Sequence, residues 1–206
     1  RRVLVSNQAG KSNVISELER LGITVPKNDQ RVGRLLDEVK SREALGYAYE
    51  GADASFELLA RRLLGEVPEY FTVDSFRVIV EKRHNAIGRM ITVSEASVRV
   101  FIKGEDEPVW SVAEGNGPVN ALDTALRKDL GRYQKLIRDV ELVDYKVRIL
   151  TGGTEAVTRV LVESRDKRSG LRWSTVGVSA NIVDASFEAL TDAITWKLMH
   201  DGAPTS

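Results

Sequence analysis

The feature that most constrains the fold of this chain is an internal repeat. The segment VWSV at 109–112 aligns with RWST at 172–175, an offset of 63 residues, and VNALDTAL at 119–126 aligns with VDASFEAL at 183–190, an offset of 64. Two similar segments in one chain are expected to fold as two copies of one supersecondary unit. The repeat therefore predicts a duplicated domain.

Each copy contains three segments with a period of two residues, followed by a segment with a helical period. Apolar and polar residues alternate in strands with one buried face, whereas spacings of three and four indicate a helix. The expected strands carry Phe76, Val78 and Val80; Ala96, Val98, Val100 and Ile102; Trp110 and Val112; Tyr145, Val147 and Ile149; Ala156, Thr158, Val160 and Val162; and LRWSTVGV at 171–178. The expected helices carry Val119, Leu122, Leu126 and Leu130, and then NIVDASFEALTDAITWKL at 181–198.

We therefore predict an α+β fold in which residues 70–206 form two βββα units, about 70–132 and 140–199, related by a pseudo-twofold axis. Three strands and one helix bury little surface alone. Pairing two units, or four in a homodimer, gives each helix a sheet to cover.

The first third of the chain is predicted to be helical. Ser12 is a candidate N-cap for a helix that Gly22 would end, because Val14, Ile15, Leu18 and Leu21 recur on one side. Two further helical stripes come next, Val32, Leu35, Leu36 and Val39, and then Phe56, Leu59, Leu63 and Leu64. Gly65 and Pro68 break the pattern. Residues 1–66 are therefore expected to form a separate helical subdomain.

Composition excludes several classes of protein. Thirty Lys and Arg balance 30 Asp and Glu, which argues against a nucleic-acid or membrane-surface partner. The chain has no cysteine, which fits the cytoplasm, and no apolar run near the ~18 residues of a membrane span. Neither His84 nor His200 has a carboxylate partner at metal-ligand spacing, so no metal site is expected. The beginning RRVLV, without Met, suits a piece of a longer protein.

The loop GNGP at 115–118 has three interpretations. Two glycines and a proline suit a tight turn at the start of a helix, and this is the simplest reading. A nucleotide loop is a poor match, because the residues after Gly117 are not Lys-Ser/Thr and a third glycine is missing. The third reading is a carboxylate site, because free N–H groups at a helix start attract small anions. Ser179 and Asn181 are cap candidates at the equivalent place in the second copy.

Four segments resemble the carboxy-terminal part of the 2-isopropylmalate synthase, citramalate synthase and homocitrate synthase family. They are RRVLVSNQAGKSNV, GNGPVNAL, LVDYKVRIL and WSTVGVSANIVDASFEALTDAITWKL. The resemblance covers nearly the whole chain, and the later segments look most like the citramalate synthase branch.

The resemblance implies an enzyme whose catalytic part lies elsewhere. Full-length members carry a TIM barrel that condenses acetyl-CoA with a 2-oxo acid, using a divalent metal held by His and Asp. This chain resembles the part after the barrel: a linker over 1–66 and an allosteric regulatory domain over 70–206. Alone it should be inactive and hold no cofactor. The family's regulatory domain binds leucine or isoleucine near a homodimer interface, and binding inhibits the distant active site.

The resemblance also assigns effector residues. An aliphatic amino acid is expected against Val119, Asn120, Leu142, Tyr145, Ile149, Ala156, Thr158 and Ile182. The free N–H groups at helix starts would hold its carboxylate, at a site that includes Gly117, Pro118 and Ser179. The Tyr145 hydroxyl needs a polar partner, which a ligand could supply. Asn120 stands where an Asp would pair with the ligand ammonium, and Asp184 is its counterpart in the second copy.

Two alternatives remain open. Leu142, Ile149, Ala156 and Ile182 could simply be core residues, which would leave a dimerisation module without a ligand. The domain could also belong to a 2-isopropylmalate synthase, with leucine as its effector.

Overall fold

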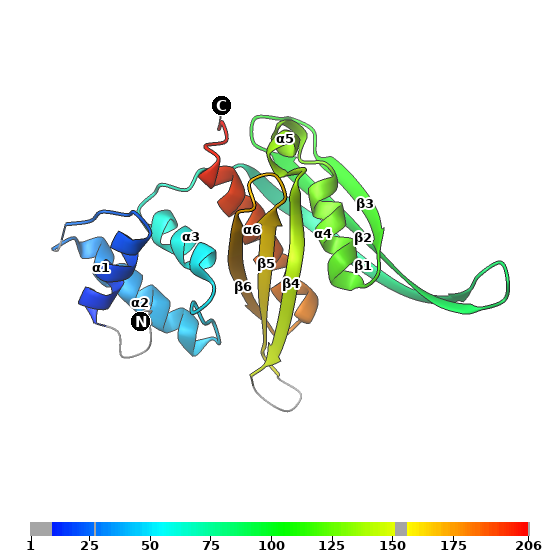
Figure 1. Ribbon diagram of the computed structural model, residues 1–206, viewed down its shortest axis with the longest axis horizontal. Coiled ribbons are helices and arrows are strands. Elements are labelled where there is room, and N and C mark those ends of the chain that lie inside the picture. Colours follow the sequence, from blue (N-terminus) through cyan, green and yellow to red (C-terminus); the bar gives the residue numbers. More distant parts are fainter. Residues whose placement is uncertain (1–9, 27, 151–155, 206) are drawn as a thin grey trace. The chain divides into compact units, whose positions relative to one another are not determined.

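The computed structural model describes residues 10–26, 28–150 and 156–205 (Figure 1). Three helices come first, followed by two runs of three strands, each of which leads into a helix. The elements are α1 (Lys11–Arg20), α2 (Gln30–Ala44), α3 (Asp53–Leu63), β1 (Phe71–His84), β2 (Met90–Ile102), β3 (Val109–Gly115), α4 (Pro118–Lys128), η1 (Gly131–Tyr133), α5 (Gln134–Ile137), β4 (Val140–Ile149), β5 (Thr158–Asp166), β6 (Arg172–Ser179) and α6 (Ile182–His200). The α+β class and the two βββα units are confirmed.

The chain forms two compact units. Unit 1 comprises residues 1–67, 143–165 and 171–196, and unit 2 comprises 68–142, 166–170 and 197–206. The helical region therefore shares a unit with most of the second repeat. The chain passes from unit 1 to unit 2 at Val67–Pro68, within the break between Gly65 and Pro68.

Helices α1, α2 and α3 each end at a glycine with positive φ: Gly22, Gly46 and Gly65. At each end the residue after the glycine donates its N–H to a carbonyl five positions back, as Tyr47 does to Arg42 (3.1 Å). The predicted stop at Gly22 is correct. The predicted cap at Ser12 is wrong, because the Gly10 carbonyl accepts from Asn13 and α1 begins at Lys11. Residues 1–9 of the amino-terminal motif lie outside the described residues.

In unit 2, β1, β2 and β3 form an antiparallel sheet in sequence order. Helix α4 packs on one face of this sheet. The apolar residues buried between them are Ala96, Val98, Val100, Ile102, Ala113, Ala121, Leu122, Ala125 and Leu126. The predicted strand at 109–112 exists, but its buried face is the other one. Ser111 and Ala113 are buried, whereas Trp110 is 62% exposed, because small side chains allow α4 to approach β3.

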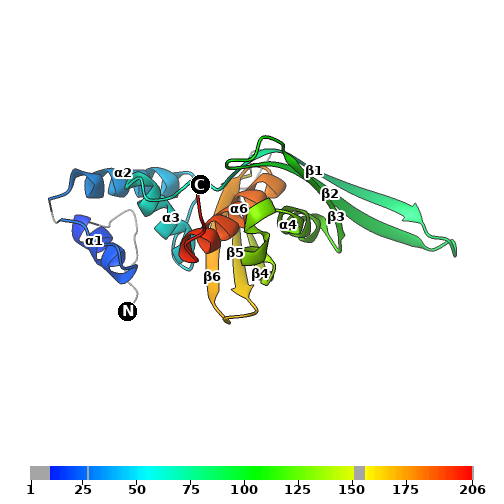
Figure 2. The ribbon, with the colours of Figure 1, turned by 90° about the horizontal axis from the view of Figure 1, so that it is seen from above.

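The hairpin of β1 and β2 is longer than the rest of its sheet. The pairing of β1 with β2 runs from Phe71↔Ile102 to His84↔Met90, whereas β3 pairs with β2 only between Ser94 and Val100. The distal part is therefore a two-stranded ribbon, which Figures 1 and 2 show as the long green arm. Asn85 closes its tip by accepting from the Ile87 and Arg89 amides.

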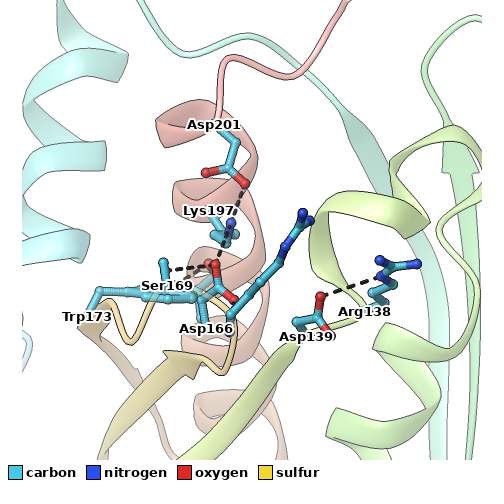
Figure 3. Close-up of polar contacts among 9 residues, drawn as sticks. Arg138, Asp139, Asp166, Ser169, Trp173, Lys197 and Asp201 are labelled. Carbon is cyan, nitrogen blue, oxygen red and sulfur yellow. Dashed lines mark hydrogen bonds and ion pairs between the residues drawn. The ribbon is translucent and has the colours of Figure 1, made fainter.

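In unit 2 a buried lysine pairs with two carboxylates, one from the end of β5 and one from beyond α6 (Figure 3). Lys197 is 4% exposed and pairs with Asp166 (3.3 Å) and with Asp201. Burial alone would raise the pKa of Asp166. The Arg168 amide, the Ser169 hydroxyl and the Lys197 ammonium outweigh burial and hold that pKa below its usual value.

In the part of the second repeat that belongs to unit 1, α6 lies on the sheet of β4, β5 and β6. The Thr175 hydroxyl donates to the Ala189 carbonyl (2.6 Å) with both groups buried. A Cβ on Gly177 would lie 1.9 Å from the Ala185 carbonyl oxygen. The residue at 177 must therefore be glycine for α6 to pack this close to β6.

Candidate effector site

The start of α4 has a proline-glycine turn and lacks a side-chain cap. Gly117 is the N-cap residue and Pro118 the first helical residue, so neither a cap side chain nor a proline N–H is present. The Asn120 side chain accepts from the Asn116 amide (3.1 Å) and closes the loop. A Cβ on Gly115 would lie 2.5 Å from the Ala121 nitrogen. Gly115 therefore allows the loop to pack closely against the first turn of α4. Gly117 has an extended backbone with φ of −175°, which any residue can adopt.

The start of α6 is capped by its own residues. The Asn181 side chain accepts from the Val183 amide (2.8 Å) and the Asp184 amide (3.3 Å). The Ser179 hydroxyl accepts from the Asn181 amide (3.1 Å). Of the two cap candidates, Asn181 takes the capping position. The Asn181 oxygen already accepts from first-turn amides of α6. The start of α4, which lacks a side-chain cap, is therefore more accessible to an anion.

The Tyr145 hydroxyl has a partner within the protein. It lies 2.9 Å from the Ser186 hydroxyl, which donates to the Ile182 carbonyl (2.6 Å). Since Ser186 uses its proton on that carbonyl, Tyr145 is the donor in their mutual bond. Ser186 was not among the sequence-predicted residues; it lies one turn after Ile182 on α6, but helical spacing alone does not show that it meets Tyr145.

Exposed apolar residues lie on the strand and at the helix start that carry this tyrosine and its partner. Alternate residues of a strand face the same side, so Val147 and Ile149 share the α6 face of the sheet with Tyr145. Val147 is 41% exposed, Ile149 67% and Ile182 45%. We call Val147, Ile149 and Ile182 the apolar patch. The part of the chain that the structure describes leaves this patch open to solvent, although its residues suit an aliphatic ligand.

The predicted effector residues fall in both units. Tyr145, Ile149 and Thr158 lie on the α6 face of the second sheet, where Thr158 is buried. The members in unit 1 are Tyr145, Ile149, Ala156, Thr158, Ser179 and Ile182, and those in unit 2 are Gly117, Pro118, Val119, Asn120 and Leu142. Their assignment to one ligand stays a prediction.

A cavity of about 300 Å³ lies elsewhere in unit 1. The stacked rings of Trp173 and Trp196 line it, with Asp53, Glu57 and Arg172. None of the predicted effector residues is part of its lining. Both indole N–H groups have partners, the Ala193 carbonyl and the Glu57 carboxylate, so the tryptophans are held within the protein.

The described ranges contain no cluster of three or more His, Cys, Asp or Glu placed to hold a metal ion. Within the same ranges, no helix combines the length and the apolar character needed to cross a membrane.

Comparison with known proteins gives one matching family and several similar proteins. Residues 50–198 match the family described as the LeuA allosteric (dimerisation) domain. The chain is 48% identical over 199 residues to a protein of Geobacter sulfurreducens named (R)-citramalate synthase, covering 96% of this chain and 36% of that protein. It is 42% identical over 203 residues to a protein of the same name from Aquifex aeolicus, covering 98% of this chain and 37% of that protein.

More distant relatives carry a second name as well. A Methanopyrus kandleri protein named "Probable 2-isopropylmalate synthase" is 31% identical over 194 residues, or 94% of this chain and 36% of that protein. The chain thus spans little more than a third of the length of each of these relatives.

Proposed function

This chain belongs to the LeuA allosteric (dimerisation) domain family, and from that premise we propose that it binds isoleucine and thereby inhibits a citramalate synthase. The chain is a regulatory and dimerisation domain of the citramalate synthase type. The observation that carries the effector proposal is the apolar patch, which leaves aliphatic side chains open beside Tyr145 at the start of α6.

Each unit by itself offers one kind of contact for such a ligand. The effector side chain packs on Ile149 and Ile182, as an aliphatic group does when it leaves water. In unit 2, taken by itself, the uncapped start of α4 at Gly117 and Pro118 is the helix start whose dipole would favour a carboxylate. Asn120 offers only an amide oxygen to the ammonium, and that oxygen already accepts from Asn116. We propose backbone carbonyls as the partners of the ammonium instead.

The proposal assigns the chemistry to the rest of the synthase. Condensation of acetyl-CoA with pyruvate, and the divalent metal that assists it, belong to a catalytic barrel outside this chain. The synthase works in the cytoplasm as a homodimer. Inhibition requires that isoleucine binds one arrangement of the dimer more tightly than the other, by ~1–3 kcal/mol.

The open face of the first sheet supports dimerisation. The Arg99 guanidinium lies over the rings of Trp110 (5.0 Å) and Phe101 (5.5 Å). Val112 and Ile79 are exposed on the same face. Trp, Phe and Arg are enriched where proteins associate, so we propose this face as the contact with a second copy.

Calorimetric titration with isoleucine, leucine and valine tests the effector proposal. Isoleucine should bind, and Ile149→Ala should weaken its binding at least tenfold without lowering Tm, because Ile149 is largely exposed. Ile87→Ala is the matched control, since Ile87 is an exposed isoleucine outside the predicted set. If leucine binds much more tightly than isoleucine, the domain belongs with the 2-isopropylmalate synthases.

A dimerisation module without a ligand is the second candidate. It is favoured by two observations: Ser186 already satisfies the Tyr145 hydroxyl, and Asn181 already caps α6. At ligand ~100 times its dissociation constant, a binder gains ~2.7 kcal/mol of stability. No thermal shift with any branched-chain amino acid would establish this second function in place of the first.

A further inference from the structure

The linker helices contact the second repeat through a set of polar groups within unit 1. We call Tyr47, Ser55, Arg62, Glu188 and Asp192 the Ser55 junction. The first three belong to the helical region, and the other two lie on α6, four residues apart and therefore on one side of that helix. All five residues lie inside this one unit.

The junction covers the free edge of the second sheet. Strand β6 is an edge strand, so alternate N–H groups point away from β5 and need another acceptor. The Ser55 hydroxyl accepts from the Val176 amide (2.9 Å), and the Glu188 carboxylate accepts from the Val178 amide (3.4 Å). Side chains of helices α3 and α6 thus accept hydrogen bonds from the outward-pointing N–H groups of this edge strand.

The same groups also bind each other. The Ser55 hydroxyl donates to the Asp192 carboxylate (3.1 Å), which also accepts from Arg62 (3.0 Å). The Tyr47 hydroxyl donates to the Glu188 carboxylate (2.6 Å). Burial raises the pKa values of both carboxyl groups, and the donors from the linker act against it. Each linker donor therefore stabilises a carboxylate on α6 that burial disfavours.

The turn that ends α2 adds a further contact. Arg159 on β5 donates to the Gly46 carbonyl (3.0 Å), and a Cβ on Gly46 would lie 2.6 Å from Leu150. By contrast, Val176 and Leu161 are the residues of the second repeat that join the apolar core of the helices. A largely polar contact can separate at moderate cost, because water replaces its hydrogen bonds.

Helix α6 connects this junction to the proposed effector contacts. Ser186, which accepts from Tyr145, and Glu188 differ by two residues, or about 200° around the helix. The two side chains therefore leave α6 on opposite sides, one toward β4 and the other toward the linker. Ile182 and Asp192 are ten residues apart, about 15 Å along the axis. If binding displaced the start of α6, the junction would be displaced with it, because a helix moves largely as a rigid element.

We propose that α6 and the Ser55 junction form a relay in which effector binding beside Tyr145 and Ile182 favours docking of α2 and α3 on strand β6. This inference rests on the proposed function. Linkage makes the relay reciprocal: an effector that favours docking binds less tightly when docking is weakened. Variants of the junction should therefore lose affinity for isoleucine although they do not touch it.

Hydrogen exchange and calorimetry on the complete chain test the relay. In the wild-type protein, isoleucine should slow exchange at the Val176 amide and throughout α3. Ser55→Ala removes both the acceptor for Val176 and the donor to Asp192, so isoleucine affinity should fall at least fivefold and the slowing in α3 should disappear. Tyr47→Phe, which removes only one hydroxyl, provides a second variant should Ser55→Ala fold poorly.

Thr191→Ala is the matched control, because the Thr191 hydroxyl bonds to the Phe187 carbonyl within α6 itself (2.8 Å). Its isoleucine affinity should stay within twofold of wild type. If wild-type protein binds isoleucine while both junction variants keep wild-type affinity, the relay is wrong and the proposed function stands. If the wild-type protein binds no branched-chain amino acid, both are wrong.

Discussion

The close packing of β6 against α6 makes Gly177→Ala a severe test of the fold of unit 1. The added Cβ would lie 1.9 Å from the Ala185 carbonyl oxygen, 2.9 Å from its carbon and 3.1 Å from the Ala189 nitrogen. Ordinary contact begins at 3.4 Å, so α6 would have to retreat by about 1.5 Å, the difference between 3.4 and 1.9 Å. All three atoms are backbone, so no side-chain rotation can relieve the contact.

We expect Gly177→Ala to cost about 3 kcal/mol or more, the upper end for overpacking, because a whole helix must shift. For a chain of this length, 1 kcal/mol lowers Tm by ~2–4 °C, so Tm should fall by about 6–12 °C in a calorimetric scan. Gly33→Ala is the matched control. Its Cβ would meet nothing closer than 3.8 Å inside α2, and alanine should stabilise that helix by ~0.5–1 kcal/mol. A Gly177→Ala protein that melts within about 2 °C of wild type would refute this close packing.

Three other substitutions probe hydrogen bonds, charges and the dimer contact. Thr175→Val removes a buried hydroxyl that bonds to Ala189 and should cost ~1 kcal/mol in urea unfolding; a wild-type midpoint would show that this bond contributes nothing. The free energies of unfolding of Asp166→Asn and Asp192→Asn, measured relative to wild type between pH 7 and pH 2.5, should change with pH in opposite directions. Asp166 has a lowered pKa, so its ionised form stabilises the fold above its unfolded pKa of ~3.9, and the deficit of Asp166→Asn should shrink as pH falls through the folded pKa. The pKa of Asp192 is raised, chiefly by burial, so its contribution to the free energy of unfolding is present below the unfolded pKa and lost as pH rises through the folded pKa. Asp192→Asn should therefore become more stable relative to wild type as pH rises. Parallel curves for the two variants would contradict this assignment. Trp110→Ala should leave Tm nearly unchanged, because the ring is 62% exposed, but should shift sedimentation toward monomer; an unaltered dimer would place the interface elsewhere.

Periodicity predicted the strands and helices of both repeats because their sequences alternate or recur on a helical stripe. It failed at β3, where Trp110 and Val112 have the parity of a buried face and are exposed. Which face of a strand is covered depends on where the next helix packs, and α4 approaches β3 on the side of Ser111 and Ala113. Apolar alternation alone does not contain that information.

Some local features of the candidate region were predictable from the sequence, whereas most of its hydrogen bonds were not. The loop before α4 could be recognised from Gly117 and Pro118, and Asn181 could be named as a cap. That Ser186 would meet Tyr145 depends on the angle at which α6 crosses β4, which no local pattern specifies. The Ser55 junction was missed for the same reason, since Ser55 and Asp192 lie 137 positions apart in the chain.

The ribbon at the end of the β1–β2 hairpin has a consequence for how the domain tolerates change. A two-stranded ribbon without a third strand is marginal in water, because fixing each residue costs ~1–2 kcal/mol of conformational entropy and few side chains are covered in return. Shortening or lengthening both strands in register therefore leaves the α4-covered core of unit 2 intact. The length of this ribbon can therefore change during evolution with little effect on the stability of the domain.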